Sequence, residues 1–295
     1  MTERIVSLPP LPARPKTGHK GTFGRVLVVG GSATMIGAPA FAAAAAYRSG
    51  AGYVQIATAE AVLLSVLGHA PEAVGLALPA GDDEWNDAID KASAVAVGPG
   101  LGQLTSGNAV VDKVLAADKP SVLDADALNL LSARDRWPAG VRARCVLTPH
   151  PGEMKRLGKL FGKTEQSPAT DDRIDTAVRA AAAFGAVVAL KGEDTVVTDG
   201  RRVYVNRTGD STLSKAGTGD VLSGITAALL GQAVEPFAAA CVAVWVHGKA
   251  GELAGAALGP RSATARDVIA HIGPAFEAYA AFYGQAPSSS SSGEG

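Results

Sequence analysis

Asn206 to Gln232 reads NRTGDSTLSKAGTGDVLSGITAALLGQ, and the interpretation of the whole chain depends on this segment. Its first half is small and polar, and from Val221 onward apolar residues recur at the spacing of one helix face. The five residues Ala216 to Asp220 (AGTGD) join the halves. The first amides of a helix lack internal partners and favour an anion. Asp220 is therefore either an ordinary N-cap or a base that takes a proton from a hydroxyl.

Outward from this segment, short β-branched runs alternate with helical patterns. Strands are predicted at 25–30, 53–58, 74–78, 93–97, 121–123, 144–147 and 186–190, with a hairpin at 195–199 and 202–205. Helices are predicted at 60–67, 106–117, 172–184, 235–258 and 265–283, among others. This alternation predicts an α/β three-layer sandwich, a mostly parallel sheet with helices on both faces. We expect one domain at 25–284, after a Pro-rich lead-in at 1–24 and before a disordered Ser/Gly tail at 285–295.

Composition narrows the class of protein. Hydrophobic residues make up 47% of the 295 residues, which is enough for one large core. A net charge of -1 argues against nucleic acid or an anionic membrane as the main partner. Cys145 and Cys241 lie in apolar contexts without metal-ligand spacing, so we expect free thiols in a reducing compartment. With no signal peptide pattern and no run of 18 apolar residues, a soluble cytoplasmic protein is expected.

Five predicted strands end on glycine-rich or polar motifs. These are Gly30-Gly31-Ser32, Gly98-Pro99-Gly100-Leu101-Gly102, Asp124-Ala125-Asp126, Thr148-Pro149-His150-Pro151-Gly152-Glu153 and Lys191-Gly192. In open α/β sheets the ligand site lies at the carboxyl ends of the strands. Each motif alone could be a turn, but five at one edge favour a site that binds phosphate and sugar or transfers protons. Neither a Walker A loop nor a Gly-x-Gly-x-x-Gly after the first strand is present.

Several of these side chains could have a structural role instead of a role in ligand binding. Glu153 could be a first-turn carboxylate of the next helix, and Lys191 a solvated lysine rather than a phosphate ligand. Asp124 and Asp126 could bind a metal, or one of them could N-cap the helix that follows. His150 lies between two prolines and is favoured as a ligand contact. The remaining histidines, at 19, 69, 247 and 271, show no metal-ligand pattern and receive no role.

Seven motifs together resemble those of a known family. In chain order they are HKGTFGRVLVVGGS, GAGYVQIAT, VGPGLG, VLDADALNLL, LTPHPGEMKRL, LKGEDTVV and GTGDVLSG. Between about 19 and 272 the chain resembles the ADP- or ATP-dependent NAD(P)H-hydrate dehydratases, which implies a ribokinase-like fold. The implied activity is that of a carbon–oxygen lyase in nicotinamide nucleotide repair. The nucleotide would phosphorylate the hydroxyl of the (S)-hydrate of NADH or NADPH, and loss of phosphate would restore the reduced ring, leaving AMP from ADP or ADP from ATP.

The resemblance also implies roles for individual residues. Asp220 would be the catalytic base, and the amides of Gly217, Thr218 and Gly219 would stabilise the transferred phosphoryl group. The nucleotide would contact Lys191, Gly192, Glu193, Asp194, Thr195 and Gly219. The hydrated dinucleotide would contact Ala38, Gly102, His150, Asn129 and Asp220, with Thr148 close by. Mg²⁺ is expected because phosphoryl transfer between anions needs charge neutralised, but no metal ligands are assigned.

The sequence departs from that family in two places. Many members carry an epimerase domain ahead of this region, so a separate epimerase protein is expected as a partner in the cell. Residues 209–217 read GDSTLSKAG where the family usually has Asn-x-Gly-Met-Ala-[Ser/Thr]-Gly-Gly, so Lys215 and Asp210 add charges close to the expected phosphates. A homo-oligomer, such as the tetramer common among relatives, is also expected.

Two other functions stay open. One is a kinase of the same fold that acts on a vitamin-precursor alcohol, which would share GTGD and the strand-end lysine. The motifs TPHPGE and DADALNLL count against it. The other is a nucleotide-binding module without chemistry, which the intact GTGD disfavours.

Overall fold

A computed structural model describes residues 2–102, 107–162 and 170–283, and its strands form one ten-stranded sheet in the order β1-β10-β9-β8-β7-β6-β5-β2-β3-β4. Among these described strands, β9 alone runs antiparallel to its neighbours. The strands are β1 (Glu3–Arg4), β2 (Arg25–Val29), β3 (Tyr53–Ala59), β4 (Val74–Leu78), β5 (Ala94–Val97), β6 (Ser121–Leu123), β7 (Cys145–Leu147), β8 (Val187–Leu190), β9 (Val196–Thr198) and β10 (Arg202–Val205).

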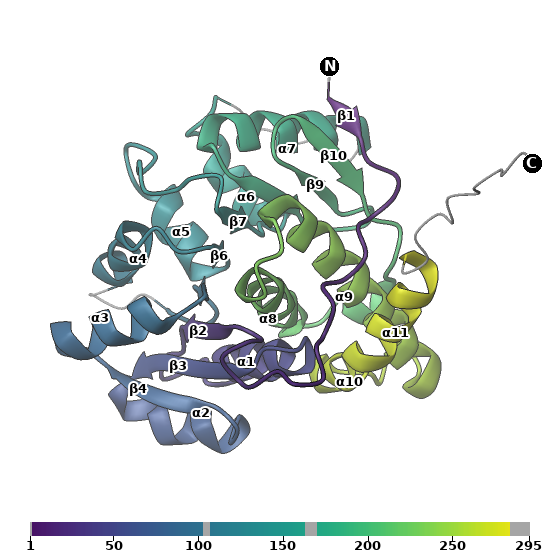
Figure 1. Ribbon diagram of the computed structural model, residues 1–295. Helices are drawn as coiled ribbons and strands as arrows, with labels where there is room; N and C mark the ends of the chain where they lie inside the picture. Colours follow the sequence, from purple (N-terminus) through teal and green to yellow (C-terminus); the bar gives the residue numbers. More distant parts are fainter. Residues whose placement is uncertain (1, 103–106, 163–169, 284–295) are drawn as a thin grey trace, which may run out of the picture.

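Two layers of helices cover the sheet (Figure 1). One layer contains α1 (Gly37–Arg48), α2 (Leu63–His69), α8 (Thr218–Gly231), α9 (Pro236–Leu258), α10 (Ala265–Ala270) and α11 (Ile272–Tyr283). The other contains α3 (Asp82–Lys91), α4 (Gly107–Ala116), α5 (Asp126–Ser132), α6 (Pro151–Gly158) and α7 (Thr170–Phe184). Short 3₁₀ helices occupy Glu60–Val62 and Ser211–Leu213. The predicted three-layer α/β sandwich is confirmed.

A hydrophobic core lies on each face of the sheet, and each central strand contributes side chains to both. In β2, Val26 and Val28 pack with the α1/α8 layer, whereas Leu27 and Val29 pack with the α4/α5 layer. Because successive side chains of a strand point to opposite faces, a strand covered on both sides must be apolar throughout. This requirement explains the uninterrupted apolar runs that made these strands recognisable in the sequence.

Small residues allow α1 and α8 to pack closely. A Cβ on Gly224 of α8 would lie 2.1 Å from the carbonyl oxygen of Ala42 in α1, so only glycine fits there. This contact holds α8 against α1, and the N-terminus of α8 lies at the carboxyl ends of the strands. The abundance of alanine and glycine in the sequence therefore has a direct packing cause.

The structure differs from the predicted elements in several places. The helix predicted at 265–283 is divided at His271 into α10 and α11. Helix α3 was not predicted, because it buries only Trp85, Ala88 and Ile89 and is otherwise polar. The helix predicted at 60–67 starts with a 3₁₀ turn and continues to His69.

The N-terminal lead-in is attached to the main body. Glu3 and Arg4 pair in parallel with β10, Leu8 is buried, and the Tyr279 hydroxyl donates a 2.6 Å hydrogen bond to the Pro9 carbonyl. The tail predicted at 285–295 lies outside the described residues. Cys145 and Cys241 are buried free thiols, as predicted. No described helix combines the length and apolarity that a membrane span requires.

Candidate active site

A cavity of about 1000 Å³ opens at the carboxyl edge of the sheet. Its wall is formed by the ends of β6, β7 and β8, the segment after β10 and the first turn of α8. The lining includes Asp124, His150, Glu153, Lys191 to Thr195, Gly217 to Asp220 and His247. The structure thus gathers at one cavity most of the motifs that the sequence placed at strand ends.

The first turn of α8 is shaped to receive an anion. Gly217 is the N-cap and has a φ of +94°, and a Cβ there would lie 2.8 Å from the Phe41 ring. Only glycine tolerates both conditions. The amides of Gly219 and Asp220 lie in the first turn, where the helix offers no carbonyl partner. They therefore remain available to a bound phosphate.

Thr218 fixes this turn from within the loop. Its hydroxyl lies 2.8 Å from the Leu213 carbonyl and 2.9 Å from the Lys215 carbonyl, both of which can accept its proton. The residue is buried, so these bonds are shielded from water. The anion-binding turn is thereby held to the residues that precede it.

Asp220 is not the N-cap of α8, so the plainer alternative for this residue is wrong. It is the third residue of the helix and lines the cavity. Burial and the negative charges of Asp124 and Asp126 raise the pKa of its carboxyl to about 7, although Lys191 lowers it in part. A carboxylate with a pKa near the working pH can accept and release a proton, as a general base must.

Lys191 is part of a buried charge network. Its Nζ atom lies 2.7 Å from Asp124 Oδ1 and 3.9 Å from Glu153 Oε2, and its side chain is 18% exposed. Ser223 of α8 donates a 2.6 Å hydrogen bond to the other Asp124 oxygen. The attraction of Asp124 and Glu153 outweighs the desolvation of the ammonium and raises the pKa of Lys191. The alternative of a solvated lysine is therefore wrong.

The same lysine also faces the anion-binding turn. A Cβ on Gly219 would lie 3.5 Å from Lys191 Nζ. The ammonium therefore adds positive charge beside the free amides of the first turn of α8. Together they can stabilise charge on a transferred phosphoryl group.

His150 and Glu153 have a structural role at the start of α6. His150 Nδ1 accepts a 3.0 Å hydrogen bond from the Gly152 amide, and Glu153 Oε2 accepts one of 2.8 Å from the His150 amide. This is a reciprocal capping arrangement, so the plainer alternative for Glu153 holds. Both residues also line the cavity. Burial, which outweighs the attraction of Lys191, raises the pKa of the Glu153 carboxyl.

The capping alternative for Asp124 and Asp126 is wrong. The N-cap of α5 is Ala125, which makes no side-chain capping bond. Asp126 instead accepts hydrogen bonds from the Gly102 amide at 2.8 Å and from Asn129 Nδ2 at 3.2 Å. Within the described ranges, no group of three or more His, Cys, Asp and Glu residues could hold a metal ion.

The predicted substrate contacts divide into two places. His150 and Asp220 line the cavity, whereas Ala38, Gly102 and Asn129 do not. Gly102 and Asn129 meet at Asp126, and a Cβ on neighbouring Gly100 would lie 2.9 Å from the Ala38 Cβ. These three residues therefore form a second cluster around the loop after β5. The structure places the two parts of the proposed substrate site next to different strands.

Sequence reasoning missed His247 in α9 and Arg156 in α6. His247 is buried, and its Nε2 lies 2.8 Å from the Thr218 carbonyl oxygen. Burial lowers the pKa of His247 to about 4, so the neutral ring donates its proton to that carbonyl. Arg156 donates a 3.0 Å bond to Asn129 Oδ1. A single histidine in an apolar helix gives no local signal of such a role, because its partner is 29 residues away.

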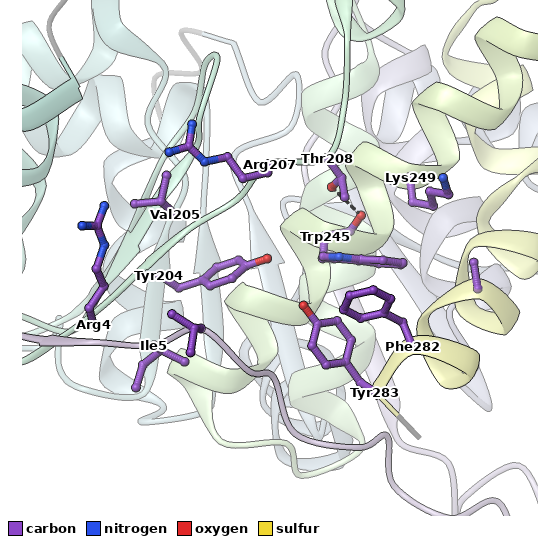
Figure 2. A pocket seen from close by; sticks show the side chains of 12 residues that line it. Arg4, Ile5, Tyr204, Val205, Arg207, Thr208, Trp245, Lys249, Phe282 and Tyr283 are labelled. Atoms are coloured by element: carbon purple, nitrogen blue, oxygen red, sulfur yellow. Dashed lines mark hydrogen bonds between the residues drawn. The ribbon is translucent and has the colours of Figure 1, made fainter. Parts of the chain in front are cut away.

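A second cavity, of about 630 Å³, lies between β10, α9 and α11 (Figure 2). Tyr204, Trp245, Phe282 and Tyr283 give it an aromatic wall. Two of its polar side chains are engaged, since Thr208 donates a 2.9 Å bond to the Trp245 carbonyl and Lys249 pairs with Glu252 at 3.0 Å. The described residues that line it include no Asp, Glu or His. Proton transfer chemistry is therefore expected in the larger cavity.

Comparison with known proteins gives consistent results. A family model described as NAD(P)H-hydrate dehydratase matches residues 26–273. The bifunctional NAD(P)H-hydrate repair enzyme of Moorella thermoacetica is 40% identical over 88% of this chain, and the match covers 50% of that enzyme. The ADP-dependent (S)-NAD(P)H-hydrate dehydratase of Neisseria meningitidis is 41% identical, over 82% of this chain and 80% of that protein. The chain spans about half the length of the bifunctional relatives.

Solved structures show the same similarity. The ADP/ATP-dependent NAD(P)H-hydrate dehydratase of Bacillus subtilis, co-crystallized with ATP/Mg²⁺, superposes with a TM-score of 0.76 at 33% identity and covers 92% of this chain and 95% of that one. A ribokinase-like superfamily protein from Enterococcus faecalis gives a TM-score of 0.78 at 25% identity, with 92% of each chain covered. The ribokinase-like fold that the motifs implied is confirmed.

Proposed function

This chain belongs to the NAD(P)H-hydrate dehydratase family, and on that premise we propose that it repairs the (S)-hydrates of NADH and NADPH. In this reaction a nucleotide phosphorylates the hydroxyl that water has added to the nicotinamide ring, and elimination of phosphate restores the reduced ring. The observation that carries the proposal is the position of Asp220. Its carboxylate has a pKa of about 7 and lies beside the free amides at the start of α8.

The geometry supports an ordered role for each group. Asp220 takes the proton from the hydrate hydroxyl, and the hydroxyl oxygen attacks the terminal phosphorus of ADP or ATP. The new O–P bond forms as the phosphoanhydride bond breaks, and AMP or ADP leaves. Phosphate then departs with the electrons of the C–O bond, while the adjacent ring carbon loses a proton to solvent and the double bond forms.

The Lys191 ammonium and the amides at the start of α8 are proposed to stabilise the phosphoryl group during its transfer. Asp220, Lys191 and the three residues Gly217, Thr218 and Gly219 line the same cavity, and a Cβ on Gly219 would lie 3.5 Å from Lys191 Nζ. The Gly219 amide is free in the first turn, whereas the Thr218 amide donates to the Lys215 carbonyl at 3.4 Å. The dipoles of this turn and the charge of Lys191 favour the transferred phosphoryl group over the unreacted state. The stretch Lys191 to Thr195 lines the same cavity and is proposed to hold the AMP portion of the nucleotide.

The residues of the cavity fit a magnesium ion that accompanies the nucleotide. Mg²⁺ retains several waters and takes one or two carboxylates together with phosphate oxygens. Glu153 offers a buried carboxylate on the cavity wall, whereas both oxygens of the neighbouring Asp124 are already bonded, one to Lys191 and one to Ser223. When bound, the ion would neutralise charge between the phosphates. The chain itself orients the hydroxyl and holds the proton at Asp220.

The substrate and the nucleotide are small molecules. Three further properties of the protein stay predictions. These are a homo-oligomer, a separate epimerase protein and a cytoplasmic location. Contacts of the hydrate with Ala38, Gly102 and Asn129 are also proposals. They rest on the resemblance and on the cluster that these residues form around Asp126.

A coupled assay tests the function. The protein is incubated with the (S)-hydrate of NADH, Mg²⁺ and either ADP or ATP, and the absorbance of the reduced nicotinamide is followed together with inorganic phosphate. We expect one phosphate and one AMP or ADP for each ring restored. A stable phosphorylated product without ring restoration would indicate a kinase instead, and nucleotide binding without any turnover would indicate a non-catalytic module.

A further inference from the structure

The segment before the anion-binding turn is fastened by a single ammonium group. Lys215 Nζ donates hydrogen bonds to the carbonyl oxygens of Pro260 and Arg261, each at 2.9 Å, and to that of Ala263. An ammonium has three N–H donors, so all of them are used. Lys215 lines the cavity, and its ammonium donates to the turn between α9 and α10.

This turn is folded so that its carbonyls converge. Helix α9 ends at Leu258, and Gly259 follows with a φ of +83°. The amides of Ser262 and Ala263 both donate to the Gly259 carbonyl at 3.1 Å, which closes the turn. Of the hydrogen bonds between described residues, only those from Lys215 reach the carbonyl oxygens of Pro260, Arg261 and Ala263. We define these three oxygens as the carbonyl cage.

The cage is connected to the active site through the Lys215 backbone. The Lys215 carbonyl is 2.9 Å from the Thr218 hydroxyl and 3.4 Å from the Thr218 amide, to which it is the acceptor. The Thr218 carbonyl in turn accepts from His247. Moving Lys215 would therefore move the peptides of Gly217 to Gly219, whose amides are proposed to receive the phosphoryl group.

A second polar contact of the loop, the 2.8 Å hydrogen bond from the Gly209 amide to Glu252 Oε1, reaches α9 and not the turn at 260–263. On the other side the loop rests on glycines of α9, where a Cβ on Gly251 would lie 2.7 Å from Leu213 and one on Gly255 would lie 2.4 Å from Thr212 Oγ1. These contacts set the depth of the loop but involve no charge. Lys215 supplies the polar connection between residues 209–217 and the turn at 260–263.

We propose that Lys215 is a positioning residue whose ammonium serves as the built-in monovalent cation of the carbonyl cage and thereby holds the anion-binding turn in its active geometry. The proposal deepens the proposed function and rests on it. Carbonyl oxygens can replace the hydration shell of a potassium ion, and ammonium is similar to potassium in charge and size. A cage of neutral carbonyls without a carboxylate suits one positive charge rather than two.

The decisive experiment removes the tethered ammonium and supplies a free one. Lys215→Ala is compared with the unaltered protein in chloride salts of tetramethylammonium, lithium, potassium and ammonium at equal ionic strength. In tetramethylammonium we expect a loss of kcat of about 10²-fold with little change in the KM for the hydrate, because misplaced groups impair the reaction more than binding. Potassium and ammonium should each raise the kcat of Lys215→Ala by at least about tenfold, and this increase should saturate with salt concentration. The unaltered protein should respond to none of the salts.

Thermal unfolding of the same samples without substrate gives a second readout. The unfolding temperature of Lys215→Ala should rise with potassium or ammonium and not with lithium. Lys215→Met, whose side chain still fills the cage, should lose activity without rescue, and Lys113→Ala, which removes an exposed lysine paired with Asp82, should match the unaltered protein.

Three results would overturn the proposal. They are full activity of Lys215→Ala in tetramethylammonium, an activity loss that no cation reverses together with no shift in unfolding temperature, or activation of the unaltered protein by potassium. If the unaltered protein fails to convert any hydrate, the proposed function fails, but the cation-dependent unfolding of Lys215→Ala still decides whether the cage exists.

Discussion

Replacement of Asp220 by asparagine should stabilise the protein while removing its activity. A carboxyl whose pKa is raised on folding binds its proton more tightly in the folded than in the unfolded chain. Its ionised form therefore destabilises the folded state. For Asp220 the pKa rises from 3.8 to about 7 because the residue is buried near Asp124 and Asp126. Asparagine has the same shape and cannot ionise.

The size of the effect depends on pH. A rise of about three pH units in a pKa corresponds to about 4 kcal/mol of folding free energy. This cost is absent below pH 3.8, where the carboxyl is neutral in both states, and it is complete above about pH 7. The asparagine variant should therefore gain on the order of 2 to 4 kcal/mol in the free energy of unfolding at pH 8 and much less at pH 5.

Urea unfolding followed by circular dichroism between pH 5 and 9, without ligand, measures this gain. Asp87→Asn is a matched control, because Asp87 is an exposed residue of α3 paired with Lys91. Turnover of the hydrate should fall by at least about 10³-fold in Asp220→Asn, within the range for loss of a general base, while ADP still binds. If Asp220→Asn were no more stable than the unaltered protein at pH 8, or retained appreciable turnover, the reasoning about Asp220 would be wrong.

Three further predictions concern the groups around Asp220. The value of kcat/KM should rise with pH through about 7 as Asp220 loses its proton. Asp124→Asn should move this rise to lower pH, because the negative charge of Asp124 then no longer raises the pKa of Asp220; an unchanged pH profile would contradict this. Lys191→Met should lower the free energy of unfolding by about 3 to 5 kcal/mol, since it leaves the buried Asp124 charge unpaired, and denaturation of the double variant Lys191→Met/Asp124→Asn should show part of the loss recovered. Gly217→Ala should reduce both thermal stability and kcat, because residue 217 has a φ of +94° and a Cβ would approach the Phe41 ring; a comparison with Gly68→Ala, where a Cβ has no neighbour within 4 Å, separates this effect from a general cost of replacing glycine.

The sequence alone determined the layers of the fold and the position of the reactive end. Strands buried on both faces must be apolar, so β2, β5 and β8 were visible as runs, and glycines and polar residues marked their carboxyl ends. The GTGD motif predicted the anion-binding start of α8 because both signals, glycine and helical periodicity, are local. The polar helix α3 and the break at His271 were missed, since neither has a strong local pattern.

Only the tertiary structure decided which charges meet. Lys191 and Asp124 are 67 residues apart, and Ser223 and Asp124 are 99 apart, so no local pattern reveals the charge network beside Asp220. The same limit applies to Lys215, which lines the cavity and whose ammonium donates to carbonyls 45 to 48 residues away. The sequence shows which side chains a loop contains. The direction of each side chain depends on the surfaces that folding brings beside it.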